Sequence, residues 1–488
     1  MMDQIRYIAP EISLLCFALI VIVLDLFIKP KKVLPVIAVA GSFVALLAVL
    51  MLWGVPVTDV FNKMLAVDQF GLFFKALILV SLVLVILASN RYVLKFEKFQ
   101  GEFYALLMLS AIGLMLLVSA INLITIYVAL ELSSISLYVL VSFLKDKQSS
   151  EAGLKYLILG AVASAILLYG MALIFGTTGN TCLTCIADYV KGMPAASLAG
   201  SPVLLIGLVL LISGFGFKIA SVPFQMWVPD VYEGAPTPIT AYLSVASKAA
   251  GFAVIARILL TAFGMPAWLH NDWAMIIAVL AVLTMTVGNI VALVQTNIKR
   301  LFGYSSIAQA GYLMVGLAAM GMAAQADSTI RSGLIFFLFS YTLTNLGAFI
   351  AIIAISNKIN SDNIDDYSGM AKRSPLLATG LTICLVSLTG LPPTAGLIAK
   401  IYIFSGAVDQ GLLWLVIIAV INSCISAFYY FKVVKVMWMG EPVNNDEVTS
   451  TWPEWLALGF CCLAVVVIGI IPGAFMAITQ NAAKIFGI

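Results

Sequence analysis

The chain has 488 residues, of which 62% are hydrophobic and only 10% are charged, and its mean hydropathy is +1.10. This composition excludes a water-soluble globular fold for most of the chain and indicates an all-α polytopic membrane protein. The formal net charge is +3, from 26 basic and 23 acidic residues, so a nucleic-acid partner with its demand for a dense basic face is not expected.

Apolar runs of about 20 residues between polar breaks predict about fourteen transmembrane helices. The first is expected to be retained, because Asp25 and Lys29 follow it where a cleaved leader would have small residues. The predicted spans are residues 8–28, 33–53, 69–89, 103–119, 121–143, 153–176, 202–226, 238–262, 273–296, 300–322, 330–356, 375–408, 412–437 and 454–476.

Basic residues gather in the loops after odd-numbered spans. By the positive-inside rule these loops are cytoplasmic, so both termini are expected on the opposite, outer side. The residues concerned are Lys29, Lys31, Lys32, Arg91, Lys95, Lys98, Lys145, Lys147, Lys299, Arg300, Lys358, Lys372, Arg373 and Lys435.

Two spans carry helix-breaking residues at membrane depth, in LLISGFGFKIASVPFQMW (210–227) and LVSLTGLPPTAGLIAKIYIF (385–404). Broken helices at matching places in two halves are typical of inverted repeats in transporters. The division we predict has N-terminal helices 1–3 (1–102), a repeat of helices 4–8 (103–262), a second repeat of helices 9–13 (263–438) and a C-terminal helix 14 (439–488). Discontinuous helices 7 and 12 then occupy equivalent positions.

Four charged residues, Glu131, Lys218, Lys248 and Lys400, lie near the middle of apolar spans. Each costs about 2.5 to 3.5 kcal/mol at the bilayer centre unless it is paired or hydrated. Glu131 and Lys248 each lie ten residues into a span, which is about 15 Å along a helix, so we expect all four near one plane.

The buried cations are lysines, which can lose their proton, whereas arginine cannot. We expect Lys218 to pair with Glu131 as a switchable proton store, with Lys248 and Lys400 continuing the path. A structural alternative is that buried ion pairs fix helix register. Three lysines against one carboxylate favour proton transfer, because at least one lysine must then be neutral or hydrated.

Glu151 and Lys155 are spaced i,i+4 at the start of span six. This pair suits a proton uptake group near the cytoplasmic face, and an ordinary interfacial salt bridge explains it equally well.

Five segments resemble one family, subunit N of the bacterial proton-pumping NADH:quinone oxidoreductase, respiratory complex I. They are QTNIKRLFGYSSIAQAGYLMVG (295–316), GFKIASVPFQMWVPDVYEGAPTPITAYLSVASKAAGF (216–252), LTGLPPTAGLIAKIYIF (388–404), LELSSISLYVL (130–140) and SSEAGLKY (149–156). The resemblance covers most of the chain in the expected order.

The resemblance implies a fourteen-helix, antiporter-like subunit with two inverted five-helix repeats in the membrane arm, beside two further antiporter-like subunits. It implies proton pumping across the bacterial inner membrane, driven by electron transfer from NADH to quinone in other subunits. NADH, FMN, iron–sulfur clusters and quinone are expected there, with no cofactor on this chain. It carries proton-translocating roles onto Glu131, Lys218, Lys248 and Lys400, and Lys155 matches a helix-six lysine.

Two other functions share this fold by resemblance, namely a subunit of a multisubunit cation/proton antiporter and a subunit of a membrane-bound hydrogenase. A passive scaffold of the membrane arm is a further alternative, although scaffolding does not require buried lysines.

One position departs from the family. Where many relatives have a histidine seven residues after the helix-seven lysine, this chain has Gln225. Its only histidine, His270, is expected in an outer loop, so no imidazole is available inside to titrate near neutral pH.

Two pairs remain open. Cys182 and Cys185 form a CxxC in an outer loop and are either a disulfide or two unrelated thiols. Asp230 and Glu233, in a predicted cytoplasmic loop, either contact a partner or a proton uptake path or reflect ordinary turn chemistry.

Overall fold

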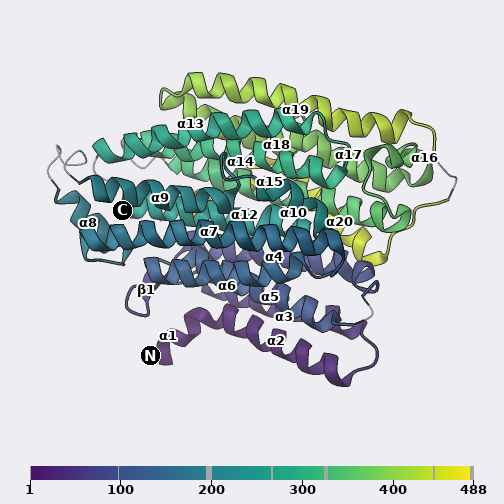
Figure 1. Ribbon diagram of the computed structural model, residues 1–488, viewed down its shortest axis with the longest axis horizontal. Coiled ribbons are helices and arrows are strands. Elements are labelled where there is room, and N and C mark those ends of the chain that lie inside the picture. The colour runs from purple at the N-terminus through teal and green to yellow at the C-terminus, as the bar shows by residue number, and fades with distance from the viewer. Residues whose placement is uncertain are drawn as a thin grey trace.

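The computed structural model describes residues 2–96, 98–193, 201–264, 267–323, 328–442 and 446–483. Its helices lie side by side along the long axis of the molecule (Figure 1). Within these ranges thirteen helices are long and apolar enough to cross a membrane. The prediction of an all-α polytopic membrane protein is confirmed.

The N-terminal segment forms the edge of the bundle drawn in purple in Figure 1. A small antiparallel hairpin lies between its second and third membrane helices, at the end of the bundle where the chain begins. The elements are α1 (Met2–Ile5), η1 (Arg6–Ile8), α2 (Ala9–Phe27), α3 (Val33–Leu52), β1 (Thr58–Val60), β2 (Leu65–Val67) and α4 (Gln69–Val93).

The predicted first repeat contains one broken membrane helix and one helix with a π-helical stretch, η2. Its elements are α5 (Gln100–Ser119), α6 (Leu123–Val141), α7 (Lys147–Thr178), α8 (Leu183–Lys191), α9 (Pro202–Ile219), α10 (Trp227–Gly234), α11 (Thr237–Tyr242), η2 (Leu243–Ser247) and α12 (Lys248–Ala262).

The remaining elements include a second broken membrane helix and end with two C-terminal helices. They are α13 (Ala267–Ala292), α14 (Ile298–Met322), α15 (Ser328–Ile359), η3 (Ile364–Tyr367), α16 (Met370–Arg373), α17 (Pro375–Thr389), α18 (Ala395–Asp409), α19 (Leu413–Met439), α20 (Trp452–Ile470) and α21 (Pro472–Ala483).

Both predicted helix breaks are present. α9 ends with Ala220 in the left-handed region at φ 64°, and α17 ends with Gly390 at φ 89°. The expected span 375–408 is therefore two shorter helices, α17 and α18, which together account for the crossing beyond the thirteen long helices.

Two sequence-based boundaries were wrong. The last span ends at Ile470 and not near 476, because Pro472 cannot continue the helix and begins α21 instead. His270 belongs to α13 and not to a loop, although its side chain lies outside the described residues.

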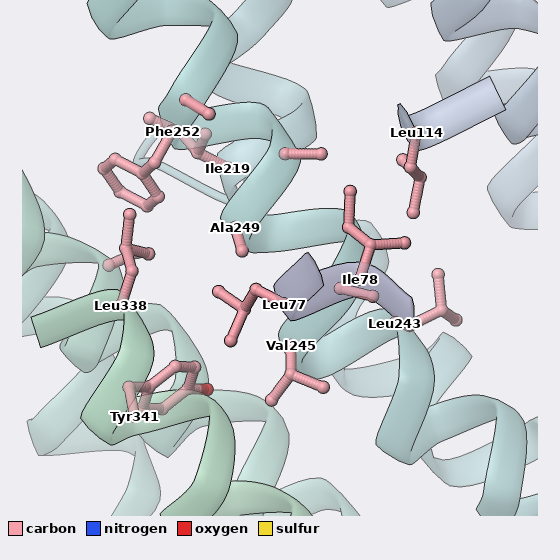
Figure 2. Close-up of a cluster of buried hydrophobic side chains, with 14 of the residues drawn as sticks. Leu77, Ile78, Leu114, Ile219, Leu243, Val245, Ala249, Phe252, Leu338 and Tyr341 are labelled. Carbon is pink, nitrogen blue, oxygen red and sulfur yellow. The ribbon is translucent and has the colours of Figure 1, made fainter. Parts of the chain in front are cut away.

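A cluster of buried hydrophobic side chains surrounds η2 and α12. Figure 2 shows Val245 and Ala249 beside Leu77 of α4, with Leu338 and Tyr341 of α15 on the other side. The span 237–262 has 94% of its most apolar window buried, whereas the window in α2 has 28% buried and must face lipid or a partner. Any charged residue at the start of α12 is consequently enclosed by protein.

Candidate functional site

Lys248 is the first residue of α12 and is only 3% exposed. Its Nζ donates hydrogen bonds to the backbone carbonyl and the hydroxyl of Ser306 on α14. The hydroxyls of Tyr232 and Tyr341 lie 3.2 Å from the same Ser306 Oγ. In the described part of the chain no carboxylate lies within 4 Å of this Nζ, so Lys248 is held by one hydroxyl and one carbonyl, both of Ser306.

Lys400 on α18 turns back over the end of α17, the other half of its broken helix. Its Nζ donates to the carbonyls of Leu388 at 3.1 Å and Thr389 at 2.8 Å, and to Ser423 Oγ at 2.7 Å. The ring of Tyr312 lies 5.0 Å from the same Nζ. Helix C-termini carry free carbonyls and partial negative charge, so the break itself supplies a site for an ammonium.

Lys218 lies in the last turn of α9, and its Nζ donates to Ser134 Oγ on α6 at 3.1 Å. No direct ion pair between Lys218 and Glu131 within 4 Å is present among the described residues. Glu131 turns toward α7, where it accepts a hydrogen bond from Ser164. Ser134 lies three residues after Glu131 on the same helix face, so the hydroxyl takes the place we had assigned to the carboxylate.

The three lysines occupy adjoining positions. A methyl group at Gly251, one turn after Lys248, would lie 3.4 Å from Cγ of Lys218, so the two helices meet closely. On the other side, a cavity of about 10 Å³ is lined by Tyr341, Ser340 and Lys400. That is about the smallest volume that holds a water molecule.

Gln309 extends this polar region on α14. It lines the same cavity, and its amide donates to the carbonyl of Leu388 at 3.1 Å, the carbonyl that also accepts from Lys400. Hydroxyl, amide and carbonyl groups therefore run between Lys248 and Lys400.

Removal of the Ser306 hydroxyl tests its importance as the shared partner of Lys248, Tyr232 and Tyr341. We expect Ser306→Ala to lower the rate of proton transfer through the membrane by about tenfold, because a charge-assisted hydrogen bond contributes about 1.5 to 3 kcal/mol. Ser305→Ala is the matched control, since the Ser305 hydroxyl contacts Tyr430 and not a lysine. Equal activities of the two variants would contradict this role.

A charged cluster joins α7, α10 and α14 at one end of the bundle. Lys155 Nζ lies 2.8 Å from both Glu151 and Asp230, and Arg300 lies 2.8 Å from both Asp230 and Glu233. Asp230 and Glu233 are thus ion-pair partners within the chain, which turn chemistry alone does not explain.

Asp230 connects the two halves of this cluster. Partial burial would raise its pKa, but hydrogen bonds from Lys155 and Arg300 outweigh that effect and lower it. A depressed pKa means that the stabilisation is present above the pKa of the unfolded chain and is lost as the pH falls through the folded pKa. We expect Asp230→Asn to cost about 1 kcal/mol or less at neutral pH, because the pairs are half-exposed.

The measurement is thermal unfolding of the purified complex between pH 4 and pH 8. The Asp230→Asn deficit should be constant from pH 6 to pH 8 and shrink toward pH 4. A deficit that grew as the pH fell would contradict the assignment. Asp188→Asn, on α8 and outside the cluster, is the control.

Sequence reasoning missed two buried ion pairs near the start of α4. Asp68, which caps α4, accepts from both guanidinium nitrogens of Arg257 at 2.6 and 2.9 Å. Lys75 lies 2.7 Å from Glu11 of α2. A lysine seven residues into an apolar run was the available signal for the second pair.

The side-chain Oε1 of Gln225 is buried without a hydrogen-bond partner among the described residues. Within the same residues, no three His, Cys, Asp or Glu side chains are close enough to hold a metal ion.

The chain matches the family model for the transmembrane region of NADH:quinone oxidoreductases and Mrp antiporters over residues 120–426. It is 48% identical to NADH-quinone oxidoreductase subunit N of Dehalococcoides mccartyi over 98% of both chains. It belongs to the subunit N family of NADH-quinone oxidoreductase. Another family member, from Trichlorobacter lovleyi, is 43% identical over 99% of this chain and 97% of its own.

Solved structures agree with this assignment. A chain of respiratory complex I from Thermus thermophilus superposes with a TM-score of 0.79 at 30% identity, covering 96% of this chain and 98% of that one. A chain of the Mrp complex from Dietzia gives a TM-score of 0.86 at 18% identity, covering 99% and 97%, which shows a common fold alone. This chain therefore has the same fold as a chain of the Mrp complex at a lower sequence identity than it has to the complex I chain.

Proposed function

We propose that this chain is a proton-translocating membrane-arm subunit of an NADH:quinone oxidoreductase. It couples electron transfer from NADH to quinone, which takes place in other subunits, to proton pumping. The observation that carries the proposal is a row of three buried lysines, Lys218, Lys248 and Lys400, whose ammonium groups contact hydroxyls and carbonyls and no carboxylate within 4 Å in the described structure. A lysine held in this way is less committed to its charged form than one in an ion pair.

In this scheme Lys218 is the proton store of the first repeat, Lys248 relays the proton and Lys400 releases it. Glu131, which lies one turn from Ser134 on α6, favours the charged form of Lys218 through its negative charge. Glu151 and Lys155 are the uptake group, because they lie in the half-exposed cluster at the start of α7. Protonation of one lysine disfavours protonation of the next, because the two positive charges repel each other. A change in protonation is thereby passed from one lysine to the next along the row.

The repeat division 103–262 and 263–438 belongs to the same proposal. Its support is the repeated plan: a broken helix in each half, with Lys218 just before one break and Lys400 shortly after the other. The flanking segments 1–102 and 439–488 would then be the additions of this family to the two repeats.

The chain is a multi-pass membrane protein, and we place it in the bacterial inner membrane with both termini on the periplasmic side. The lysine-rich loops support cytoplasmic exposure of the end that bears α16. In Figure 1, α1 lies at the opposite end of the bundle from α16, together with β1 and α8. The partners in the complex are the other membrane-arm subunits, including two further antiporter-like subunits, and the bilayer.

Inverted membrane vesicles separate this function from cation/proton antiport. The proposal predicts NADH-driven acidification of the lumen that disappears when this chain is deleted and returns when it is restored. An antiporter subunit instead predicts proton movement driven by a sodium gradient without NADH. Sodium-driven exchange that depends on this chain, together with unchanged NADH-driven pumping after its deletion, would overturn the proposal.

A further inference from the structure

Cys182 and Cys185 lie at the start of α8, outside the membrane-spanning helices. Their segment belongs to a small backbone layer at one end of the bundle. Cys182 forms a β-bridge with Asn122 just before α6, and Leu65 of the hairpin forms another with Ala120. The amide of Leu183 also donates to the carbonyl of Ile121 at 2.9 Å. The two cysteines are therefore held by a fixed backbone.

The side chains of the pair are close to each other and differ in access. Cys182 is the N-cap residue of α8 and Cys185 is the third residue of the helix, a spacing that brings the two side chains together at the helix start. Cys182 is buried and its Sγ lies 3.1 Å from Thr184 Oγ1, whereas Cys185 is partly exposed. The ammonium of Lys63, from the turn of the hairpin, lies 3.9 Å from Cys185 Sγ and is exposed. A nearby cation favours the thiolate, which is the reactive form of cysteine, but the neighbouring Cys182 side chain has the larger effect and raises the pKa of the Cys185 thiol. Access to solvent, and not its pKa, therefore makes Cys185 the thiol that a donor meets first.

We propose that Cys182 and Cys185 are a redox-active dithiol that closes to an intrachain disulfide by exchange with a small-molecule disulfide. The Cys185 thiolate, beside Lys63, attacks the donor disulfide, forms a mixed disulfide and releases one donor thiolate. The Cys182 thiolate then attacks the Cys185 sulfur, forms the Cys182–Cys185 bond and releases the second donor thiolate. The two cysteines are oxidised by two electrons, the donor is reduced by two, and their two protons pass to solvent.

The environment of Cys182 suits the second step. Burial would raise the pKa of its thiol, but hydrogen bonds from the Cys185 and Thr184 side chains and from their backbone amides outweigh burial and lower it. A helix N-terminus adds to this effect in CxxC motifs. Cys182 is thus suited to attack a mixed disulfide formed on Cys185.

A second cysteine pair provides a matched comparison. Cys384 on α17 and the partly buried Cys462 on α20 come from two helices that pack together, and both are in the membrane part of the bundle. No charged side chain of the described chain lies within hydrogen-bonding distance of either thiol. A water-soluble donor should leave this pair reduced.

The test is differential alkylation of the purified complex after treatment with oxidised glutathione. Free thiols are blocked under denaturing conditions, disulfides are then reduced and labelled with a second reagent, and peptides are mapped by mass spectrometry. Cys182 and Cys185 should take the second label in equal amounts, while Cys384 and Cys462 keep the first. A synthetic peptide of residues 180–187 should react several-fold more slowly, because it lacks Lys63 and the fixed backbone.

Variants resolve the order of steps. Cys182→Ser should accumulate glutathione on Cys185, Cys185→Ser should leave Cys182 unmodified, and Lys63→Gln should slow the reaction several-fold. First-reagent label on both cysteines, or a rate no faster than that of the peptide, would overturn the proposal. These readouts do not depend on proton transport, so a failure of this proposal can be distinguished from a failure of the proposed function.

Discussion

Replacement of Lys400 with arginine is expected to lower proton pumping by on the order of 100-fold, the lower end of what a positioned proton-transfer group contributes. Arginine keeps the positive charge and can still donate to the carbonyls of Leu388 and Thr389 at the end of α17. It cannot release its proton, however. The variant therefore separates a proton carrier from a structural cation that only caps the broken helix.

Lys432→Arg is the matched control for this experiment. Lys432 lies on α19, is exposed, and among the described residues donates only to the carbonyl of Gln295 at 3.3 Å. NADH-driven pumping should be close to that of the unmodified complex in Lys432→Arg and largely lost in Lys400→Arg, with both complexes assembled. Normal pumping by Lys400→Arg would assign Lys400 a purely structural role.

Replacement of Asp68 with asparagine is expected to destabilise the chain by about 3 to 5 kcal/mol, because it leaves a buried guanidinium without its counter-charge. Asp68 and Arg257 are each about 4% exposed, and their contact is bidentate. Arg257 also donates to the carbonyl of Val118 on α5, so the pair joins α4, α5 and α12. The measurement is the amount of assembled complex in membranes and its thermal unfolding.

The double variant Asp68→Leu/Arg257→Leu provides the control. Removal of both charges together should recover most of the lost stability, because no unpaired buried charge remains. If the double variant were as unstable as Asp68→Asn, packing and not electrostatics would be the cause.

The Asp68 carboxyl also predicts a pH dependence. Burial would raise its pKa, but Arg257, with help from the Gly71 amide and Lys75, outweighs burial and lowers it. Because the folded pKa is depressed, the stabilisation is complete above the unfolded value of about 3.9 and is lost as the pH falls below it. The difference between wild type and Asp68→Asn should thus stay constant from pH 5 to pH 8.

Hydropathy and helix-breaking residues sufficed to predict the helices, the two interruptions and the burial of the three lysines. The free-energy cost of a charged side chain rises with its depth in the bilayer, and its depth follows from its position within the span. Lys218, Lys248 and Lys400 are all 5% exposed or less, as that reasoning requires.

The partners of those lysines could not be predicted. α6, α14 and α19 have no distinct apolar face, so their sequences do not indicate which side of the helix turns inward. A rotation of α6 about its own axis by less than one turn decides whether Glu131 or Ser134 contacts Lys218. Coulomb reasoning favoured the carboxylate, whereas packing placed Glu131 against α7 and left the serine for the lysine.

The Glu11–Lys75 pair was missed for a different reason. Lys75 lies early in its span and Glu11 precedes the middle of the first helix, so neither appeared central. Their pairing links two helices that are far apart in sequence, and such contacts follow from tertiary packing alone.

Side-by-side measurement of NADH-driven proton pumping and quinone reductase activity in a Lys218→Ala complex, with assembly verified, tests the central claim most directly. If protons pass through this subunit, pumping is lost, whether or not electron transfer falls with it. Pumping and turnover that both match the unmodified complex would contradict the account and leave the chain as a scaffold of the membrane arm.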